Sequence, residues 1–156
     1  HLRVELPHGD FHLREGSTAP IVMLASGTGF APIKSMVEDG LRRGQAREIA
    51  LYWGARTEKD LYLLDLARGW GEQAGLRFVP VLSEPEAGWS GRTGFVHQAV
   101  LQDHDSLAGH QVYACGAPAM VSAARSDFVE TRGLPPDAFF CDAFVVAQPR
   151  TSALTD

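Results

Sequence analysis

Residues 21–37 read IVMLASGTGFAPIKSMV, and this stretch decides the fold. Its first part, Ile21–Ala25, is a continuous apolar run, which is typical of a strand buried on both faces of a parallel sheet. Gly27 and Gly29 then form a turn. The apolar residues after the turn recur at helical spacing through Arg43, at Ile33, Met36, Val37 and Leu41. The stretch therefore predicts a strand, a glycine turn and a helix in direct succession.

The same alternation continues to the end of the chain. Further strands are predicted at Glu48–Gly54, Leu76–Leu82, Gln111–Cys115 and Ala138–Phe144. Between them we expect a helix capped by Asp60, with Leu63, Leu66, Ala67, Trp70 and Ala74 on its apolar face, a short helix at Phe95–Leu101, and a helix that begins at Pro118. The prediction is a three-layer α/β fold with a five-stranded parallel sheet and helices on both faces. Such sheets bind ligands beyond the carboxyl ends of their strands.

Composition excludes several classes of partner. The chain has 156 residues, 45% of them hydrophobic, and a net charge of -5, which fits one globular domain. Lys and Arg do not cluster, so neither a nucleic acid nor an anionic membrane is an expected partner. No apolar run approaches the roughly 20 residues of a membrane span, and no signal peptide is visible, so we expect a cytoplasmic protein. The start at His1 indicates an excised fragment. Two cysteines, Cys115 and Cys141, are too few for a disulfide framework or a four-ligand metal site.

The first turn is the best candidate for a ligand site. Gly27 and Gly29 leave no side chain between the backbone and a ligand, and the helix behind them offers free N–H groups to a pyrophosphate. The alternative is a tight turn that binds nothing. Pro32 fits the first position of a helix and stands where the dinucleotide fingerprint has its third glycine, so an ordinary Rossmann dehydrogenase is a poor match.

Two other strand ends carry candidates. Cys115 and Gly116 end the fourth strand, where the cysteine either packs against a planar ring or is a small core residue. Arg56 follows the second strand, where it either contacts an adenosine ribose, a 2′-phosphate or adenine, or is a solvated loop residue. No acidic residue stands at that strand end, the histidines do not cluster, and no Gly-x-Ser-x-Gly elbow is present.

The order of these pieces resembles the ferredoxin–NADP reductase family, above all its oxygenase-reductase and CDP-6-deoxyhexose-reductase branches. The resemblance rests on Leu6-Pro7-His8-Gly9-Asp10-Phe11, on Gly27-Thr28-Gly29-Phe30-Ala31-Pro32, on Gly54-Ala55-Arg56 with Asp60-Leu61, on Gly91-Arg92-Thr93-Gly94 with Val96, and on Cys115-Gly116-Ala117-Pro118-Ala119-Met120. It implies that residues 1–16, with a strand–turn–strand at Val4–Arg14, are a remnant of a flavin-binding barrel. Residues 17–147 are then an NAD(P)-binding domain, and residues 148–156 a polar tail.

The resemblance also assigns roles to residues. The turn formed by Gly27, Thr28, Gly29, Ala31 and Pro32 would face the pyrophosphate, and Gly54 and Arg56 the adenosine end. Cys115 would lie against the nicotinamide, with Gly116, Ala117 and Met120 beside it. Asp142 and Phe144 would lie next to the flavin ring.

The resemblance implies an NAD(P)H-dependent flavin oxidoreductase, in which a hydride passes to FAD and electrons pass on to an iron–sulfur centre. The chain lacks the Arg-x-Tyr-Ser flavin motif and the cysteine cluster of a [2Fe–2S] domain. FAD would therefore be held by a flavin domain of the intact protein and the cluster by another domain or a partner, so we expect the chain alone to be inactive. Glu58 and Asp60 offset Arg56, Thr57 and Lys59, which favours NADH over NADPH.

Two other functions are open to this fold. A regulatory or interaction domain could keep the sheet without catalysis, but it would have no need of the glycine turn or of Cys115-Gly116. A flavodoxin-like receiver or FMN domain would need a Ser- and Thr-rich phosphate loop or an acidic pocket after Ile21–Ala25, and the chain has neither.

Overall fold

The structure is a computed structural model that describes residues 11–72 and 76–143. The elements follow one another as β1 (Ile21–Ser26), the 3-10 turn η1 (Gly27–Gly29), α1 (Phe30–Arg42), β2 (Ile49–Ala55), η2 (Glu58–Asp60), α2 (Leu64–Gly71), β3 (Leu76–Leu82), β4 (Arg92–Thr93), α3 (Val96–Asp103), β5 (Gln111–Gly116), α4 (Pro118–Arg132), η3 (Pro136–Ala138) and β6 (Phe139–Ala143).

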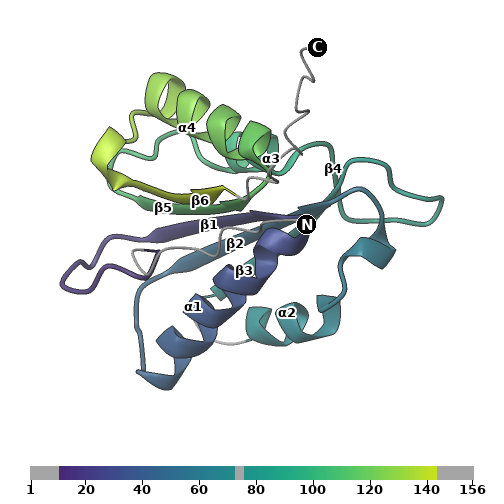
Figure 1. The fold of residues 1–156 in the computed structure, drawn as a ribbon, viewed down its shortest axis with the longest axis horizontal. Helices are drawn as coiled ribbons and strands as arrows, with labels where there is room; N and C mark the ends of the chain where they lie inside the picture. The colour runs from purple at the N-terminus through teal and green to yellow at the C-terminus, as the bar shows by residue number, and fades with distance from the viewer. Residues whose placement is uncertain (1–10, 73–75, 144–156) are drawn as a thin grey trace, which may run out of the picture.

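The strands form one parallel sheet in the order β4-β3-β2-β1-β5-β6. Helices α1 and α2 cover one face, and α3 and α4 cover the other, so the fold has three layers (Figure 1). The predicted α/β class is confirmed. In chain order, β2, β3 and β4 are added on one side of β1, and β5 and β6 are then added on its other side. The strand order therefore reverses between β1 and β5, and doubly wound sheets bind their ligands at such a reversal.

Most differences from the sequence prediction concern short elements. The sheet has six strands instead of five, because Arg92–Thr93 adds a two-residue strand to the end of β3, too short for a period of alternation to be recognised. Asp60 caps the separate turn η2 rather than α2. Pro32 is the third residue of α1, not the first. Residues 11–14 form no strand, and the rest of the expected hairpin lies outside the described residues.

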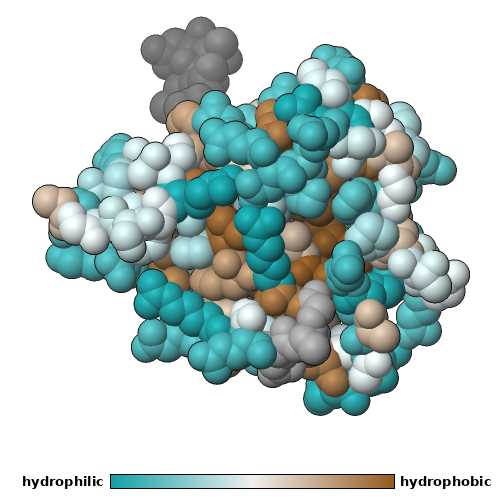
Figure 2. Space-filling view, turned by 180° about the vertical axis from the view of Figure 1, so that it is seen from behind, coloured by the Kyte–Doolittle hydropathy of each residue, from teal (hydrophilic) through white to brown (hydrophobic). Residues whose placement is uncertain are grey.

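The core explains why the first stretch is so apolar. All five residues of Ile21–Ala25 are buried, because β1 lies in the middle of the sheet with a helical layer on each face. Large apolar side chains are seldom exposed in the described part, and those that are include Tyr62 and Phe95. From behind, hydrophobic residues gather in the middle of the visible face with hydrophilic ones around them (Figure 2).

A cluster of polar side chains lies at the C-terminal end of α3. The Tyr52 hydroxyl donates to Asp103 Oδ2 at 2.8 Å and lies 3.3 Å from His104 Nε2. Arg92 pairs with the other oxygen of Asp103 at 2.6 Å. The ring of His110 meets that of His104 edge-on, with 5.3 Å between centroids. Burial lowers the pKa of both histidines, and the neighbouring His110 lowers that of His104 further.

These two histidines make stability depend on pH. Because their pKa values in the folded chain lie below the ordinary value near 6.5, folding favours the neutral rings. Their contribution to the free energy of unfolding is complete above about pH 6.5 and is lost as the pH falls below that value. We expect the free energy of unfolding, measured with urea, to fall between pH 7.5 and 5.5. The double variant His104→Gln, His110→Gln should flatten this window. An equal slope in both proteins would contradict the assignment.

Candidate functional site

A cavity of about 940 Å³ opens at the carboxyl edge of the sheet, where β1, β2 and β5 end. This volume lies within the range of about 300–1,000 Å³ that is common for small-molecule sites. The cavity is lined by the residues that follow these strands and by those that begin α3 and α4, namely Ser26, Gly27, Thr28, Gly54, Ala55, Arg56, Asp60, Tyr62, Ser83, Gly94, Phe95, Val96, His97, Gly116, Ala117, Pro118, Ala119 and Met120. We call it the strand-end cavity.

Three helical segments begin at this cavity. The turn η1 leads into α1 at Gly27 and Thr28, α3 begins at Val96, and α4 begins at Pro118. The first backbone N–H groups of a helix have no partner within it, and the helix dipole makes this end partly positive. Since these ends share one cavity, the strand-end cavity is suited to a polyanionic group such as a pyrophosphate.

Gly116 lines the strand-end cavity at the point where the ends of β1 and β5 approach each other closely. Its φ of +140° is one that L side chains rarely adopt, and an added Cβ would lie 2.2 Å from Ser26 Oγ. Ser26 Oγ in turn accepts a hydrogen bond from Ala117 N at 3.0 Å. Only glycine allows the ends of β1 and β5 to approach in this way.

The two glycines of the first turn have different roles. Gly27 has a φ of +53° with no atom within 4 Å of an added Cβ, so its backbone is open to the strand-end cavity. Gly29 is buried, and an added Cβ would lie 2.3 Å from the carbonyl oxygen of Cys115. Gly29 therefore packs η1 against the end of β5 and does not line the cavity.

Trp53 binds the turn η1 through a hydrogen bond from its side chain. Its indole Nε1 donates to the carbonyl oxygen of Gly27 at 3.1 Å, and its ring stacks on Phe30 with centroids 3.8 Å apart. The sequence alone does not single out Trp53, because an apolar residue near the end of a buried strand carries no mark of what it supports. The pattern of one indole N–H below a glycine turn is visible only in three dimensions.

Polar and aromatic residues line or adjoin the strand-end cavity. Arg56 forms an ion pair with Glu84 at 3.2 Å, and both side chains are exposed. The Thr57 hydroxyl donates to Asp60 Oδ2 at 3.0 Å. Tyr62 and Phe95 line the same cavity and are 52% and 62% exposed, although both are large and apolar. Exposed aromatic rings in a cavity that Arg56 also lines are suited to a nucleobase and its sugar.

Cys115 lies behind the cavity wall. Its side chain is fully buried, and burial, with smaller contributions from Asp142 and Cys141, raises the pKa of its thiol to about 12. The thiol is therefore neutral at physiological pH. Asp142 stands opposite Cys115 in the pairing of β5 with β6. Phe144 lies outside the described residues.

The structure thus divides the predicted site residues into groups. The strand-end cavity brings together Gly27, Thr28, Gly54, Arg56, Gly116, Ala117 and Met120. Gly29 and Cys115 lie beneath its wall. Ala31 and Pro32 instead line a second cavity, of about 1070 Å³, between α1 and the segment before β1. Tyr62, Phe95 and His97 are wall residues that were not predicted, because each follows a loop whose course the local sequence does not determine.

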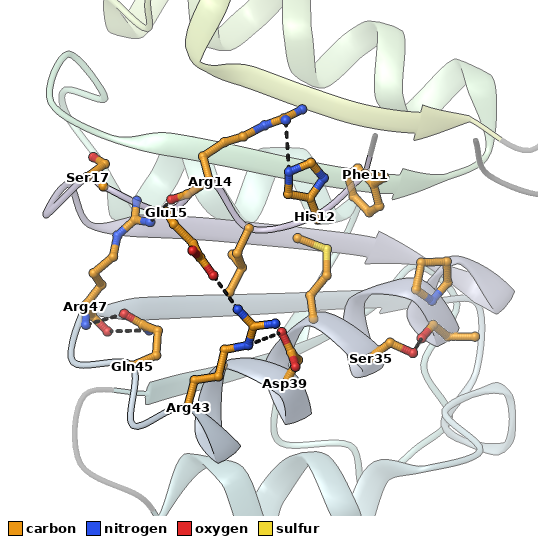
Figure 3. Close-up of a pocket in the computed structure, with 16 residues that line it drawn as sticks. Phe11, His12, Arg14, Glu15, Ser17, Ser35, Asp39, Arg43, Gln45 and Arg47 are labelled. Carbon is orange, nitrogen blue, oxygen red and sulfur yellow. Dashed lines mark hydrogen bonds and ion pairs between the residues drawn. The ribbon is translucent and has the colours of Figure 1, made fainter. Parts of the chain in front are cut away.

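The second cavity differs in character from the first. It runs along α1 beside residues 11–17, away from the meeting point of the strand ends. Arg43 forms an ion pair across it with Glu15 and a second one with Asp39 on its own side (Figure 3). In residues 11–72 and 76–143 there is no group of three or more His, Cys, Asp or Glu that could hold a metal ion. Within the same residues, no helix has the length and apolar character needed to cross a membrane.

Comparisons with known proteins agree with this geometry. The family model of the oxidoreductase NAD-binding domain matches residues 23–126. The CDP-6-deoxy-L-threo-D-glycero-4-hexulose-3-dehydrase reductase of Yersinia pestis is 48% identical over 145 residues, which cover 92% of this chain and 43% of that protein. An NAD(P)H-flavin reductase of Vibrio harveyi is 35% identical over 148 residues, which cover 92% of this chain and 61% of that protein.

A solved structure supports the same assignment. The cytochrome P450 reductase of Amycolatopsis is 37% identical with a TM-score of 0.79, and the match covers 88% of this chain and 42% of that one. The chain thus spans about half the length of the relatives that it matches. With the glycine turn, the strand-end cavity and the strand order described above, these matches show that the chain belongs to the oxidoreductase NAD-binding domain family, of the ferredoxin–NADP reductase type.

Proposed function

We propose that the strand-end cavity binds NADH and holds its nicotinamide for hydride transfer to FAD, which a flavin domain of the same protein carries. One observation supports this above all others. At the point where β1 and β5 end, three helix starts surround two backbone positions without side chains, Gly27 and Gly116. A pyrophosphate needs both N–H donors and close backbone approach, and this junction offers them together.

The walls suggest the orientation of the dinucleotide. The exposed rings of Tyr62 and Phe95, which line the same cavity as Arg56, favour the adenosine end. The nicotinamide would then lie toward Gly116–Met120, in front of the buried Cys115. Asp142, the neighbour of Cys115 on β6, and Phe144 after it are proposed to lie beside the flavin.

NADH and FAD, when bound, would supply the chemistry, a two-electron hydride transfer that oxidises the dihydronicotinamide and reduces the flavin. This chain's residues need to align the two rings and keep water out. No acid or base is needed, which agrees with the neutral thiol of Cys115. We propose that an iron–sulfur centre, in another domain or a partner, receives the electrons.

The sheet leaves a surface on which a flavin domain could pack. Helix α4 covers one face of β6, and on the opposite face Phe140 is only partly buried, with Tyr113 and Arg14 against it. The segment before β1 lies along this face (Figure 3). A domain that precedes the chain would reach this surface first.

A cytoplasmic location stays a prediction from composition.

The charges at the adenosine end favour NADH. Of the donors that could hold a 2′-phosphate, Arg56 pairs with Glu84, and the Thr57 hydroxyl is bonded to Asp60. A 2′-phosphate would meet the carboxylates of Glu84 and Asp60, whereas a ribose hydroxyl can donate to them.

Binding is tested by calorimetric titration of the chain with NADH. The variant Gly27→Ala should raise the Kd by about tenfold or more, because its methyl group would occupy the space needed for close backbone approach. Gly29→Val is a poor test, since it would collide with Cys115 and disturb packing.

Gly44→Ala is the matched control for this titration. Gly44 also has a positive φ, +69°, with nothing within 4 Å of an added Cβ, but it lies in the loop before β2 and does not line the strand-end cavity. Both variants place an L side chain at a positive φ, which costs about 1–2 kcal/mol. Equal Kd values for the two variants would contradict the proposed site.

Cofactor preference is tested with Glu84→Gln in the full-length protein. Removing this carboxylate frees Arg56 for a phosphate, so the ratio of kcat/KM for NADPH to that for NADH should rise about tenfold or more. Glu86→Gln removes the same charge two residues further along the loop but leaves the Arg56–Glu84 pair in place, and it should leave the ratio unchanged. If both variants change the ratio alike, general charge and not the Arg56–Glu84 pair is responsible.

A further inference from the structure

Tyr113 connects β5 to the segment before β1. Its ring is fully buried. Its hydroxyl accepts a hydrogen bond from the backbone N of Arg14 at 2.9 Å and donates one to Gln111 Oε1 at 3.0 Å. A hydroxyl has one donor and two acceptor positions. Tyr113 therefore uses its donor within β5 and an acceptor position on a residue 99 positions earlier in the chain.

Arg47 strengthens the same connection from the loop before β2. Its guanidinium donates to the carbonyl oxygen of Ala19 at 2.7 Å, to that of Arg14 at 3.0 Å and to Gln111 Oε1 at 2.7 Å. Gln111 Oε1 thus accepts from both Arg47 and Tyr113. Because the donor is a charged fork with several N–H groups, these bonds hold the segment in one position.

Aromatic contacts extend the connection to β6. The Tyr113 ring stacks on the Phe140 ring, with 5.0 Å between the ring centroids and an interplanar angle of 24°. The ring of Phe11, in the segment before β1, lies with its centroid 6.3 Å from that of Tyr113. The Arg14 guanidinium lies 4.7 Å from the centre of the Phe140 ring. Tyr113 is therefore in contact with the segment through both its hydroxyl and its ring.

The opposite side of the segment is less firmly held. Figure 3 shows the larger cavity between residues 11–17 and α1, bridged at Glu15 by an ion pair to Arg43. Both of these side chains are mostly exposed, and exposed ion pairs contribute little. The position of the segment is thus set mainly from β5, by Tyr113 and the Arg47–Gln111 pair.

Tyr113 also lies close to the proposed transfer site. It is two residues before Cys115 on β5 and on the same face, which places the two Cα atoms about 6.6 Å apart along the strand. Its stacking partner Phe140 is two residues before Asp142 on β6. The strand pair that carries Cys115 and Asp142 therefore also fixes the segment before β1.

We propose that Tyr113 is a positioning residue: it fixes residues 11–17, and through them the flavin domain that we propose precedes them, relative to the strand-end cavity. The hydroxyl sets where the segment lies, and the ring transmits this position to β6. The effect on hydride transfer rests on the proposed function, but the effect on the segment does not.

The first test uses the chain itself, without cofactors. Tyr113→Phe keeps the ring and removes both hydroxyl bonds, so the amide of Arg14 should exchange its hydrogen about three- to tenfold faster, as one lost hydrogen bond implies. Tyr52→Phe is the matched control, since it also removes a buried hydroxyl bond, to Asp103, but on the other face of the sheet. Unchanged exchange at Arg14 in Tyr113→Phe would overturn the proposal.

A second variant guards against a folding defect. Arg47→Met removes the three bonds to Ala19, Arg14 and Gln111 from outside β5, and it should speed exchange at Arg14 while Tyr113 stays in place. If neither variant changes exchange in residues 11–17 while both chains remain folded, the segment is held by something else.

The second test uses the full-length protein with FAD bound. Rapid mixing with NADH should show flavin reduction slowed several-fold in Tyr113→Phe, with the Kd for NADH unchanged, whereas Tyr52→Phe should behave like the wild type. Equal rates in all three proteins would overturn the role in transfer. A wild type that binds NADH but does not reduce its flavin would overturn the proposed function instead, and the exchange result at Arg14 would still stand.

Discussion

The close approach of two turns governs this structure. The turn after β1 packs against the end of β5 without a side chain between them, because Gly29 lies on the backbone of Cys115 and Gly116 lies on Ser26. A methyl group at either glycine would force the strand ends apart. With the strands held together, the turn η1 and the first turn of α4 face one cavity, and Cys115 is buried beneath it. The anion-binding character of the site follows from this contact.

The parts of the fold with strong local signals could be predicted from the sequence. Ile21–Ala25 is apolar because β1 is central, and α1 shows helical spacing because only one of its sides is buried. The two-residue strand β4 has no such signal, since it exists only through its pairing with β3. The predicted helix after Asp60 begins later, because the Thr57–Asp60 bonds close a separate turn first.

The site was predicted as a set of strand ends, and the strand-end cavity does unite most of them. What could not be predicted is the role of each residue within it. Gly27 and Gly29 are alike in sequence, yet one is open to the cavity and the other is a packing contact. Tyr62 and Phe95 come from loops after different elements, and they line the same cavity only once the whole sheet is assembled. The polar pair of Arg56 and Glu84 joins residues 28 positions apart.

Trp53 gives the molecule a built-in optical reporter. Its indole is stacked on Phe30, shielded from water and bonded through Nε1 to the carbonyl of Gly27. Indole emission depends on the polarity of its surroundings and on this N–H bond. A ligand that shifts the glycine turn therefore changes the light that Trp53 emits, so occupancy of the site is readable without any attached label. The residue that supports the turn also makes the state of the turn visible.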